Sequence, residues 1–206
     1  MLWPTLNDPV HDSQRLFRQL LTAMSEPGTL HTLEAPSPPT GDIGAALWGS
    51  LLTLCDLETR VWLAPTLDTP ALREALALHI GCRLTTAPEQ ADFALVTPHE
   101  IRNTSGLDKD SVQGFSQGSD EYPDRSTTLL VVLDVLATDT GTGGTWQLSG
   151  PGIAVRRTLS VGQSARPLMQ RLSANRGCFP CGLDAILTCG KQLAALPRTT
   201  RLEEVA

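Results

Sequence analysis

The sequence has no hydrophobic run near the ~18 consecutive apolar residues that a membrane span requires, so we expect no transmembrane segment. Residues Met1 to Asp8 lack both a basic stretch and an apolar stretch, and we therefore expect no signal peptide. Without an export signal, the cysteines are expected to be reduced thiols and the protein to be cytoplasmic.

Aromatic side chains are also scarce, at 4% of the sequence, and the net charge is −6. Proteins that bind nucleic acids are normally basic and interleave aromatic with basic residues. Both features are missing here, so we expect no nucleic-acid partner. The 41% hydrophobic and 18% charged residues are ordinary for a globular protein, and the chain length suits one domain over residues 1–206.

Two familiar phosphate-binding signatures are absent as well. The sequence contains neither the P-loop pattern G-x-x-x-x-G-K-[ST] nor the dinucleotide pattern G-x-G-x-x-G, and its four histidines show no metal-ligand spacing. The only lysines are Lys109 and Lys191, so a cofactor held covalently by lysine would have just two possible anchors. We identify no complete catalytic constellation and predict no metal site and no cofactor.

Basic residues are few in the first 150 residues and gather at the C-terminal end. Residues 1–150 carry 19 acidic and 8 basic side chains, a net charge of −11, whereas residues 151–206 carry 3 acidic and 8 basic side chains, a net charge of +5. Such asymmetry suits a complementary partner or a phosphate-bearing ligand, although two faces of one domain that neutralise each other would give the same totals. Arg156, Arg157 and Arg198 are our candidates for binding an anion or ligand.

Three of the five cysteines lie between Arg176 and Thr200, and Cys178 and Cys181 form a C-x-x-C. A redox C-x-x-C normally sits at a helix N-terminus, but the residues from Gly182 onward predict a turn and then a strand. Zinc usually takes four ligands from two spaced pairs, and no second pair exists. We interpret these cysteines as structural thiols and leave a metal or redox role as the alternative.

The pattern of apolar residues alternates between helical and extended periods. Helices are predicted at 12–25, with Asp12 as the N-cap, and at 43–54, 70–80 and 164–175. Strands are predicted at 29–33, 60–64, 93–97, 127–135, 146–148, 153–159 and 185–188, with a long polar loop over 102–126 and an extended tail at 194–197. The β-branched segment 127–135 is typical of a strand buried on both faces. This order predicts a single three-layer α/β domain with a mixed sheet.

Six segments, in order along the whole chain, carry a resemblance to a known family. They read F-R-Q-L-L-T-A-M-S-E-P-G (17–28), L-T-L-C-D (52–56), P-E-Q-A-D-F (88–93), L-S-G-P-G-I (148–153), F-P-C-G-L-D (179–184) and L-P-R-T-T (196–200). The second segment is followed by V-W-L (61–63), and the fifth continues as I-L-T-C-G (186–190). Together they resemble PhnH, the H-subunit family of bacterial carbon–phosphorus lyase. The shared element of the fifth segment is F-P-x-G-x-D, which includes neither Cys178 nor Cys181, so the resemblance lends no support to a metal or redox role.

The resemblance implies a role in the breakdown of phosphonates. Members of the family act in a core complex with the G, I and J subunits. With the G, I and L subunits they are associated with forming α-D-ribose 1-methylphosphonate 5-triphosphate from ATP and methylphosphonate. Their fold is similar to that of pyridoxal-phosphate-dependent transferases but without the cofactor, and isolated members look dimeric. The resemblance supplies no catalytic residue.

Two functions follow as hypotheses. The first is an accessory subunit that binds its sister subunits G, I and J and has no complete active site of its own. The second is an independent nucleotide-binding or phosphonate-binding enzyme that uses the C-terminal arginine cluster.

Overall fold

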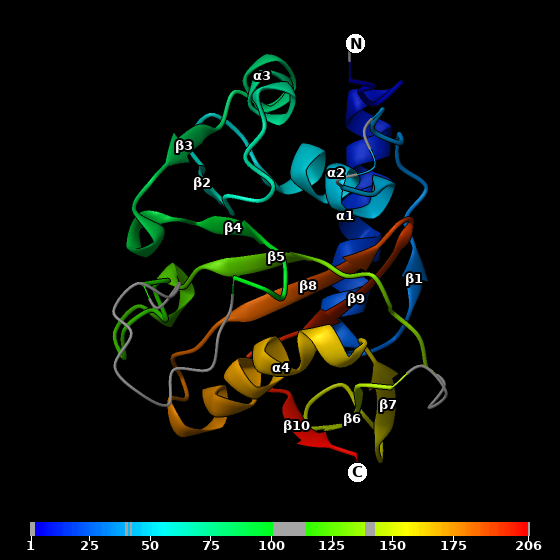
Figure 1. The fold of residues 1–206 in the computed structure, drawn as a ribbon, viewed down its shortest axis with the longest axis vertical. Helices are drawn as coiled ribbons and strands as arrows, with labels where there is room; N and C mark the ends of the chain where they lie inside the picture. The colour runs from blue at the N-terminus through cyan, green and yellow to red at the C-terminus, as the bar shows by residue number, and fades with distance from the viewer. Residues whose placement is uncertain (1–2, 40, 42, 101–113, 139–142, 206) are drawn as a thin grey trace.

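A central sheet of seven strands organises the computed structural model, which describes residues 3–39, 41, 43–100, 114–138 and 143–205 (Figure 1). The strand order is β1-β9-β8-β5-β4-β2-β3. The strands are β1 (His31–Thr32), β2 (Arg60–Leu63), β3 (Arg83–Thr85), β4 (Phe93–Val96), β5 (Thr128–Val132), β8 (Asp184–Cys189) and β9 (Gln192–Leu196). The five strands from β3 to β8 are parallel to their neighbours, whereas β9 pairs antiparallel with both β8 and β1. The predicted mixed sheet is thereby confirmed.

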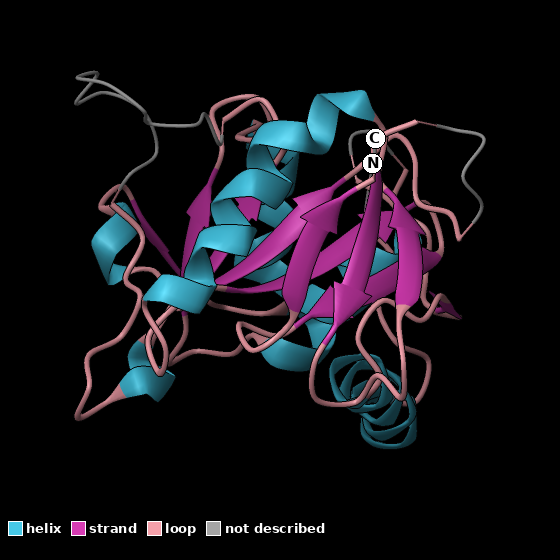
Figure 2. Cartoon of the chain, turned by 90° about the horizontal axis from the view of Figure 1, so that it is seen from below, coloured by secondary structure: helices cyan, strands magenta, loops and turns pink. Residues whose placement is uncertain are grey.

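A second, smaller sheet is antiparallel, in the order β10-β6-β7. Its strands are β6 (Thr145–Ser149), β7 (Arg157–Ser160) and β10 (Arg201–Glu204). In the view from below, this sheet and helix α4 (Arg166–Ser173) lie in front of the large sheet (Figure 2). The other helices, α1 (Pro9–Ser25), α2 (Ala45–Leu54) and α3 (Pro70–His79), cover the opposite face (Figure 1).

The large sheet is buried on both faces, because successive side chains of a strand point to opposite sides. On β5, Leu130 packs into the core formed with α1, α2 and α3, whereas Leu129 and Val131 pack into the core formed with α4 and the small sheet. On β8, Ile186 and Leu187 divide between the same two cores. The strand predicted to be buried on both faces is therefore confirmed, although it ends at Val132.

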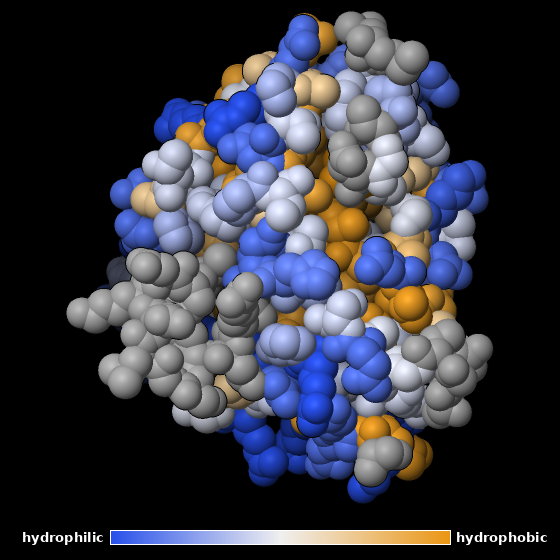
Figure 3. All heavy atoms as spheres, in the orientation of Figure 1, coloured by the Kyte–Doolittle hydropathy of each residue, from blue (hydrophilic) through white to orange (hydrophobic). Residues whose placement is uncertain are grey.

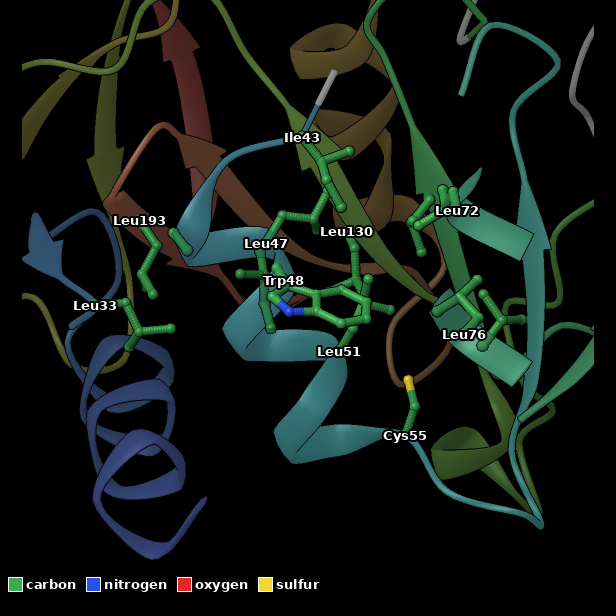
Figure 4. Packing of buried hydrophobic residues seen from close by; sticks show 14 of the residues in the cluster. Leu33, Ile43, Leu47, Trp48, Leu51, Cys55, Leu72, Leu76, Leu130 and Leu193 are labelled. Atoms are coloured by element: carbon green, nitrogen blue, oxygen red, sulfur yellow. The ribbon is translucent and has the colours of Figure 1, made fainter. Parts of the chain in front are cut away.

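Helix α2 is buried along most of its length, and Trp48 lies at the centre of its core (Figure 4). The Trp48 ring packs edge-to-face on Trp3, with 4.8 Å between ring centroids. Its indole Nε1 donates to the Pro4 carbonyl at 2.8 Å, so its one polar atom is satisfied. These contacts hold the N-terminal segment against α2.

The helix boundaries differ from the sequence prediction by one or two residues in α2, α3 and α4 and by three residues at the start of α1. Helix α1 begins at Pro9, and its N-cap is Asp8, whose carboxylate accepts hydrogen bonds from the N–H groups of Val10 and His11. Asp12 was the predicted cap, and this was wrong, because proline at the first helical position allows the helix to start a turn earlier. Helix α4 is shorter than predicted, because 3₁₀ turns at Gln163–Ala165 and Ala174–Gly177 flank it.

Several extended segments also differ from the prediction. The predicted strand over 153–159 begins only at Arg157, and the predicted tail at 194–197 is part of β9. Strands β3 and β10 were not predicted. Within the predicted 102–126 loop, residues 102–113 lie outside the described residues, and Pro123–Arg125 forms a 3₁₀ turn.

The hydropathy of the surface varies from one part of the molecule to another. On the face shown in Figure 3, hydrophobic atoms gather in a band beside α2, whereas hydrophilic side chains cover most of α4. The two ends of the described chain lie at opposite ends of its longest dimension (Figure 1). Among the described residues, no helix combines the length and the apolar character needed to cross a membrane.

Candidate ligand-binding site

A cavity of about 310 Å³ lies where several of the family-like segments meet. It is lined by Pro151, Arg176, Phe179, Arg198, Thr199, Thr200 and Arg201. Pro151 belongs to the L-S-G-P-G-I segment, Phe179 to F-P-C-G-L-D, and Arg198 to L-P-R-T-T. Three segments far apart in the sequence therefore build one cavity.

The end of α1, which belongs to the first family-like segment, packs against the segment that contributes Pro151. The Arg157 guanidinium donates to the Pro27 carbonyl at 2.5 Å. Gly152 has φ +78° and approaches α1 so closely that a Cβ there would lie 2.1 Å from the Ser25 carbonyl oxygen. Only glycine combines this backbone conformation with this close approach.

Arg198 is held by Asp184, the last residue of the F-P-x-G-x-D element. The Asp184 carboxylate accepts from the Arg198 backbone N–H at 2.7 Å and pairs with the guanidinium at 2.5 Å. Both side chains are largely buried, at 15% and 16% exposure. The guanidinium also donates to the Ser126 hydroxyl at 2.6 Å and to the Pro123 carbonyl. Each of its nitrogens has a protein acceptor, so Arg198 positions the turn after β9.

The turn that carries Phe179 is fixed by a buried amide. Asn175 is 3% exposed, donates from Nδ2 to the Leu183 carbonyl at 2.8 Å and accepts from the Leu183 N–H at 3.0 Å. Gly182 has φ +143°, and a Cβ there would lie 2.8 Å from Asn175 Oδ1. The glycine of F-P-x-G-x-D therefore permits the clamp that holds this segment at the cavity.

Three polar groups of the cavity lining remain available. Arg176 and Arg201 are exposed, and neither guanidinium forms an ion pair or a hydrogen bond with any residue in the described part of the chain. Thr200 is 5% exposed, and its buried hydroxyl has no hydrogen-bond partner among the described residues. Buried hydroxyls are normally hydrogen-bonded, so this one requires an explanation.

Further basic character lies close to the cavity. Arg171, on the last turn of α4, is partly buried, and this burial lowers the pKa of its guanidinium. Arginine nevertheless keeps its charge in proteins. Arg171 does not line the cavity, but its charge interacts with Cys178, which precedes the cavity residue Phe179.

The predicted ligand-binding arginines do not gather at one place. Arg198 lines the cavity, but Arg156 and Arg157 do not. Arg156 donates to the Gln147 side-chain oxygen at 2.5 Å, and Arg157 holds the Pro27 carbonyl. A ligand-binding role for these three residues stays a prediction. The sequence reasoning did not single out Arg176 or Arg201, although both belong to the C-terminal arginine cluster that it recognised.

The C-x-x-C lies next to the cavity, after the 3₁₀ turn Ala174–Gly177 and before β8, as the sequence predicted. Cys178 is exposed, and the Cys181 thiol donates to Asp120 at 3.7 Å. Burial and the neighbouring Asp120 raise the pKa of the Cys181 thiol, whereas reactive redox cysteines have a lowered pKa. Within the described part of the chain, no group of three or more His, Cys, Asp or Glu side chains could hold a metal ion.

A second cavity, of about 400 Å³, lies at the carboxyl ends of β2 and β3. This edge of a parallel sheet is a common ligand site. The charged residues of its lining, Asp68 and Arg73, pair with each other at 2.5 Å, and the hydrogen bond from Arg73 lowers the pKa of Asp68. Its charges are therefore already satisfied, unlike those of Arg176 and Arg201.

One short match to a catalytic pattern has a structural explanation. Gly114 to Gly118 reads G-F-S-Q-G, the spacing of a hydrolase nucleophile elbow, which places its serine on a sharp strand-to-helix turn. Here Gln117 forms an isolated bridge with Ser126, and the Ser116 hydroxyl donates to the Arg125 carbonyl at 2.9 Å. The segment is not such an elbow.

The fold and this cavity define a mixed α/β protein that presents arginine side chains at a site built from distant segments. The chain matches the family model described as bacterial phosphonate metabolism protein (PhnH) over residues 4–203, and it belongs to that family.

Two relatives are similar to the chain over most of its length. The chain is 33% identical over 198 residues to alpha-D-ribose 1-methylphosphonate 5-triphosphate synthase subunit PhnH of Rhizobium meliloti (strain 1021), covering 95% of this chain and 92% of the relative. It is 30% identical over 189 residues to the putative C-P lyase subunit protein HtxG of Stutzerimonas stutzeri, covering 92% of this chain and 85% of the relative. The predicted family is confirmed.

Proposed function

We propose that this chain is a subunit of a carbon–phosphorus lyase system for phosphonate catabolism. It is associated with forming α-D-ribose 1-methylphosphonate 5-triphosphate from ATP and methylphosphonate. The observation that carries the proposal is the family match over residues 4–203, together with two relatives, matched over 92% and 85% of their length, that are named as subunits of such systems.

Its role in the complex is accessory. The cavity lining contains no His, Cys, Asp or Glu side chain that could act as a nucleophile or a base, and its best-placed arginine, Arg198, is bound by Asp184. The alternative of an independent enzyme that uses Arg156, Arg157 and Arg198 has less support, because the structure does not bring these three side chains to one site.

Helix α1 offers a surface for a partner. Val10, Phe17 and Leu21 are 72%, 48% and 57% exposed, and their spacing of seven and four residues places them along one face of the helix. Exposed apolar rows of this kind mark interaction sites. We propose that the partners are the sister subunits G, I and J, and that the isolated chain pairs with a second copy of itself.

Further parts of the proposal concern fold and location. The mixed seven-stranded sheet with helices on both faces supports a fold like that of pyridoxal-phosphate-dependent transferases. Both cores share this sheet, which supports one domain over residues 1–206. We propose a cytoplasmic location, where ATP and the sister subunits meet.

Co-expression tests the proposal. A tagged form of the chain is expected to capture the G, I and J subunits, and the double variant Phe17→Asp/Leu21→Asp is expected to capture less. The matched control is Leu78→Asp, which changes an equally exposed leucine (62%) on α3 and is expected to behave as wild type. Failure of the wild-type chain to capture any sister subunit would count against a subunit role.

A further inference from the structure

The cavity beside the F-P-x-G-x-D element has the size and shape of a small-ligand site. Ligand pockets usually measure about 300–1,000 Å³, and this one, at about 310 Å³, lies at the lower end. Its walls come from the loop after α4, the turn between β6 and β7, and the turn that joins β9 to β10. Hydrogen bonds of Asn175 and Asp184 hold two of these walls in place. The cavity is therefore preformed.

The charge at the cavity is positive. Arg198 contributes no net charge, because Asp184 neutralises it at 2.5 Å. Arg176 and Arg201 approach the cavity from two different walls, and no acidic side chain in the described part of the chain pairs with either of them. A nearby acidic residue of β10, Glu204, is already paired with Arg166 at 2.8 Å. Two guanidinium groups without an acid are suited to a phosphate or phosphonate, whose oxygens they can bind in pairs.

The hydroxyl of Thr200 is an independent indication of a ligand. Thr200 follows the turn in which its own N–H donates to the Pro197 carbonyl at 2.8 Å, so its backbone is fixed. Thr200 is 5% exposed and lines the cavity, and its hydroxyl has no hydrogen-bond partner among the described residues. A ligand oxygen in the cavity would accept from this hydroxyl and satisfy it.

The remaining lining is apolar. Phe179 is 66% exposed although it belongs to a family-like segment, and Pro151 stands on another wall. An exposed aromatic ring beside basic groups suits a ligand that combines an oxyanion with an apolar or aromatic part.

We propose that this cavity binds a tetrahedral phosphorus oxyanion through Arg176, Arg201 and the Thr200 hydroxyl. The chemistry is shared by the phosphate end of a nucleotide and by an alkylphosphonate. The inference rests on the cavity itself and does not depend on the proposed subunit role.

Calorimetric titration of the purified full-length chain, alone and in complex with any sister subunits that it captures, tests the site. The probes are ATP, methylphosphonate and inorganic phosphate in separate titrations, which distinguish a nucleotide from a phosphonate source. Saturable binding of at least one probe is expected, and the double variant Arg176→Gln/Arg201→Gln should weaken it at least tenfold. The control Arg83→Gln removes an exposed arginine of β3 that lies outside the cavity lining and should change affinity less than twofold.

The variant Thr200→Val separates a ligand role from a structural one. It keeps the side-chain shape and removes the unsatisfied hydroxyl, so the unliganded variant should melt at the same temperature as wild type or higher while it binds the probe several-fold more weakly. Absence of saturable binding of all three probes would overturn the proposal, as would equal weakening by Arg83→Gln. Capture of sister subunits by Arg176→Gln/Arg201→Gln is measured in parallel, so failure of the site and failure of the subunit role are distinguishable.

Discussion

The ion pair of Arg198 with Asp184 is largely buried, whereas that of Arg166 with Glu204 is exposed. The Arg198 guanidinium and the Asp184 carboxylate are 15% and 16% exposed, whereas those of Arg166 and Glu204 are 54% and 33% exposed. Removing one partner of a buried pair leaves the other charge unpaired, whereas exposed pairs contribute little. Arg198 therefore stabilises the turn after β9, whereas Arg166 lies on the surface and contributes little to stability.

This difference predicts the effect of substitution at the two sites. Arg198→Met is expected to lower the free energy of unfolding by about 3–5 kcal/mol, because it leaves Asp184 buried without its partner. The control Arg166→Met should lower it by less than about 1 kcal/mol. Urea denaturation followed by circular dichroism measures both, and similar losses in the two variants would show that the Asp184–Arg198 pair is not a structural lock.

The sequence allowed short motifs to be recognised, but it did not show which of their side chains contact one another. The L-P-R-T-T segment and the F-P-x-G-x-D element were recognised, and so was the improbability of a redox helix at Cys178. The pairing of Arg198 with Asp184 and Ser126 joins positions 14 and 72 residues apart. No short-range pattern encodes such a contact, so Arg198 was a candidate ligand residue in the sequence, while Arg176 and Arg201 were not singled out.

The family-like segments contact one another in the turns at the ends of helices and strands. The end of α1 lies against Gly152, and the turn between β9 and β10 lies against Gly150. At Gly152 the backbone contact leaves no room for a Cβ, and at Gly150 a Cβ would lie 3.1 Å from the Thr199 carbonyl oxygen. The segments are thus recognisable in sequence because their positions relative to one another are fixed.

Gly152 gives the clearest prediction at this scale. Gly152→Ala adds a Cβ that would lie 2.1 Å from the Ser25 carbonyl oxygen, and it places alanine at φ +78°. The unfavourable backbone conformation alone is worth about 1–2 kcal/mol, so we expect a total loss of stability above about 2 kcal/mol. The matched control is Gly177→Ala, where a Cβ would meet nothing within 4 Å. Thermal melts of the two variants check this, and equal melting temperatures would contradict the close contact between α1 and Gly152.

The elements themselves were predicted unevenly. The four helices α1 to α4 and the buried strand β5 were located from the sequence, although their boundaries differ from the predicted ones. Strands β3 (Arg83–Thr85) and β10 (Arg201–Glu204) were missed, because they are short and lie at sheet edges, where half-exposed or charged side chains hide the periodicity. The sequence also did not predict that β9 pairs antiparallel with β8, because the direction of pairing depends on the partner strand and not on the residues of one strand alone.

For the whole molecule, the uneven charge of the sequence has a spatial meaning. Residues 151–206, with a net charge of +5, supply α4, the strands β7 to β10 and all seven residues that line the cavity. The acidic first 150 residues supply most of the large sheet and the helices on its other face. The basic end therefore carries the ligand site, and the exposed apolar row of α1 lies on the other side of the sheet.

Phosphonate-dependent release of adenine from ATP is the measurement that tests the subunit role most directly. The reaction breaks the bond between adenine and ribose C1 and forms a bond from C1 to a methylphosphonate oxygen, so each product molecule releases one adenine. We predict that a mixture of the G, I and L subunits releases adenine from ATP and methylphosphonate when this chain is present, and at a much lower rate when it is absent. Equal rates with and without the chain would contradict its assignment as a working subunit of the system.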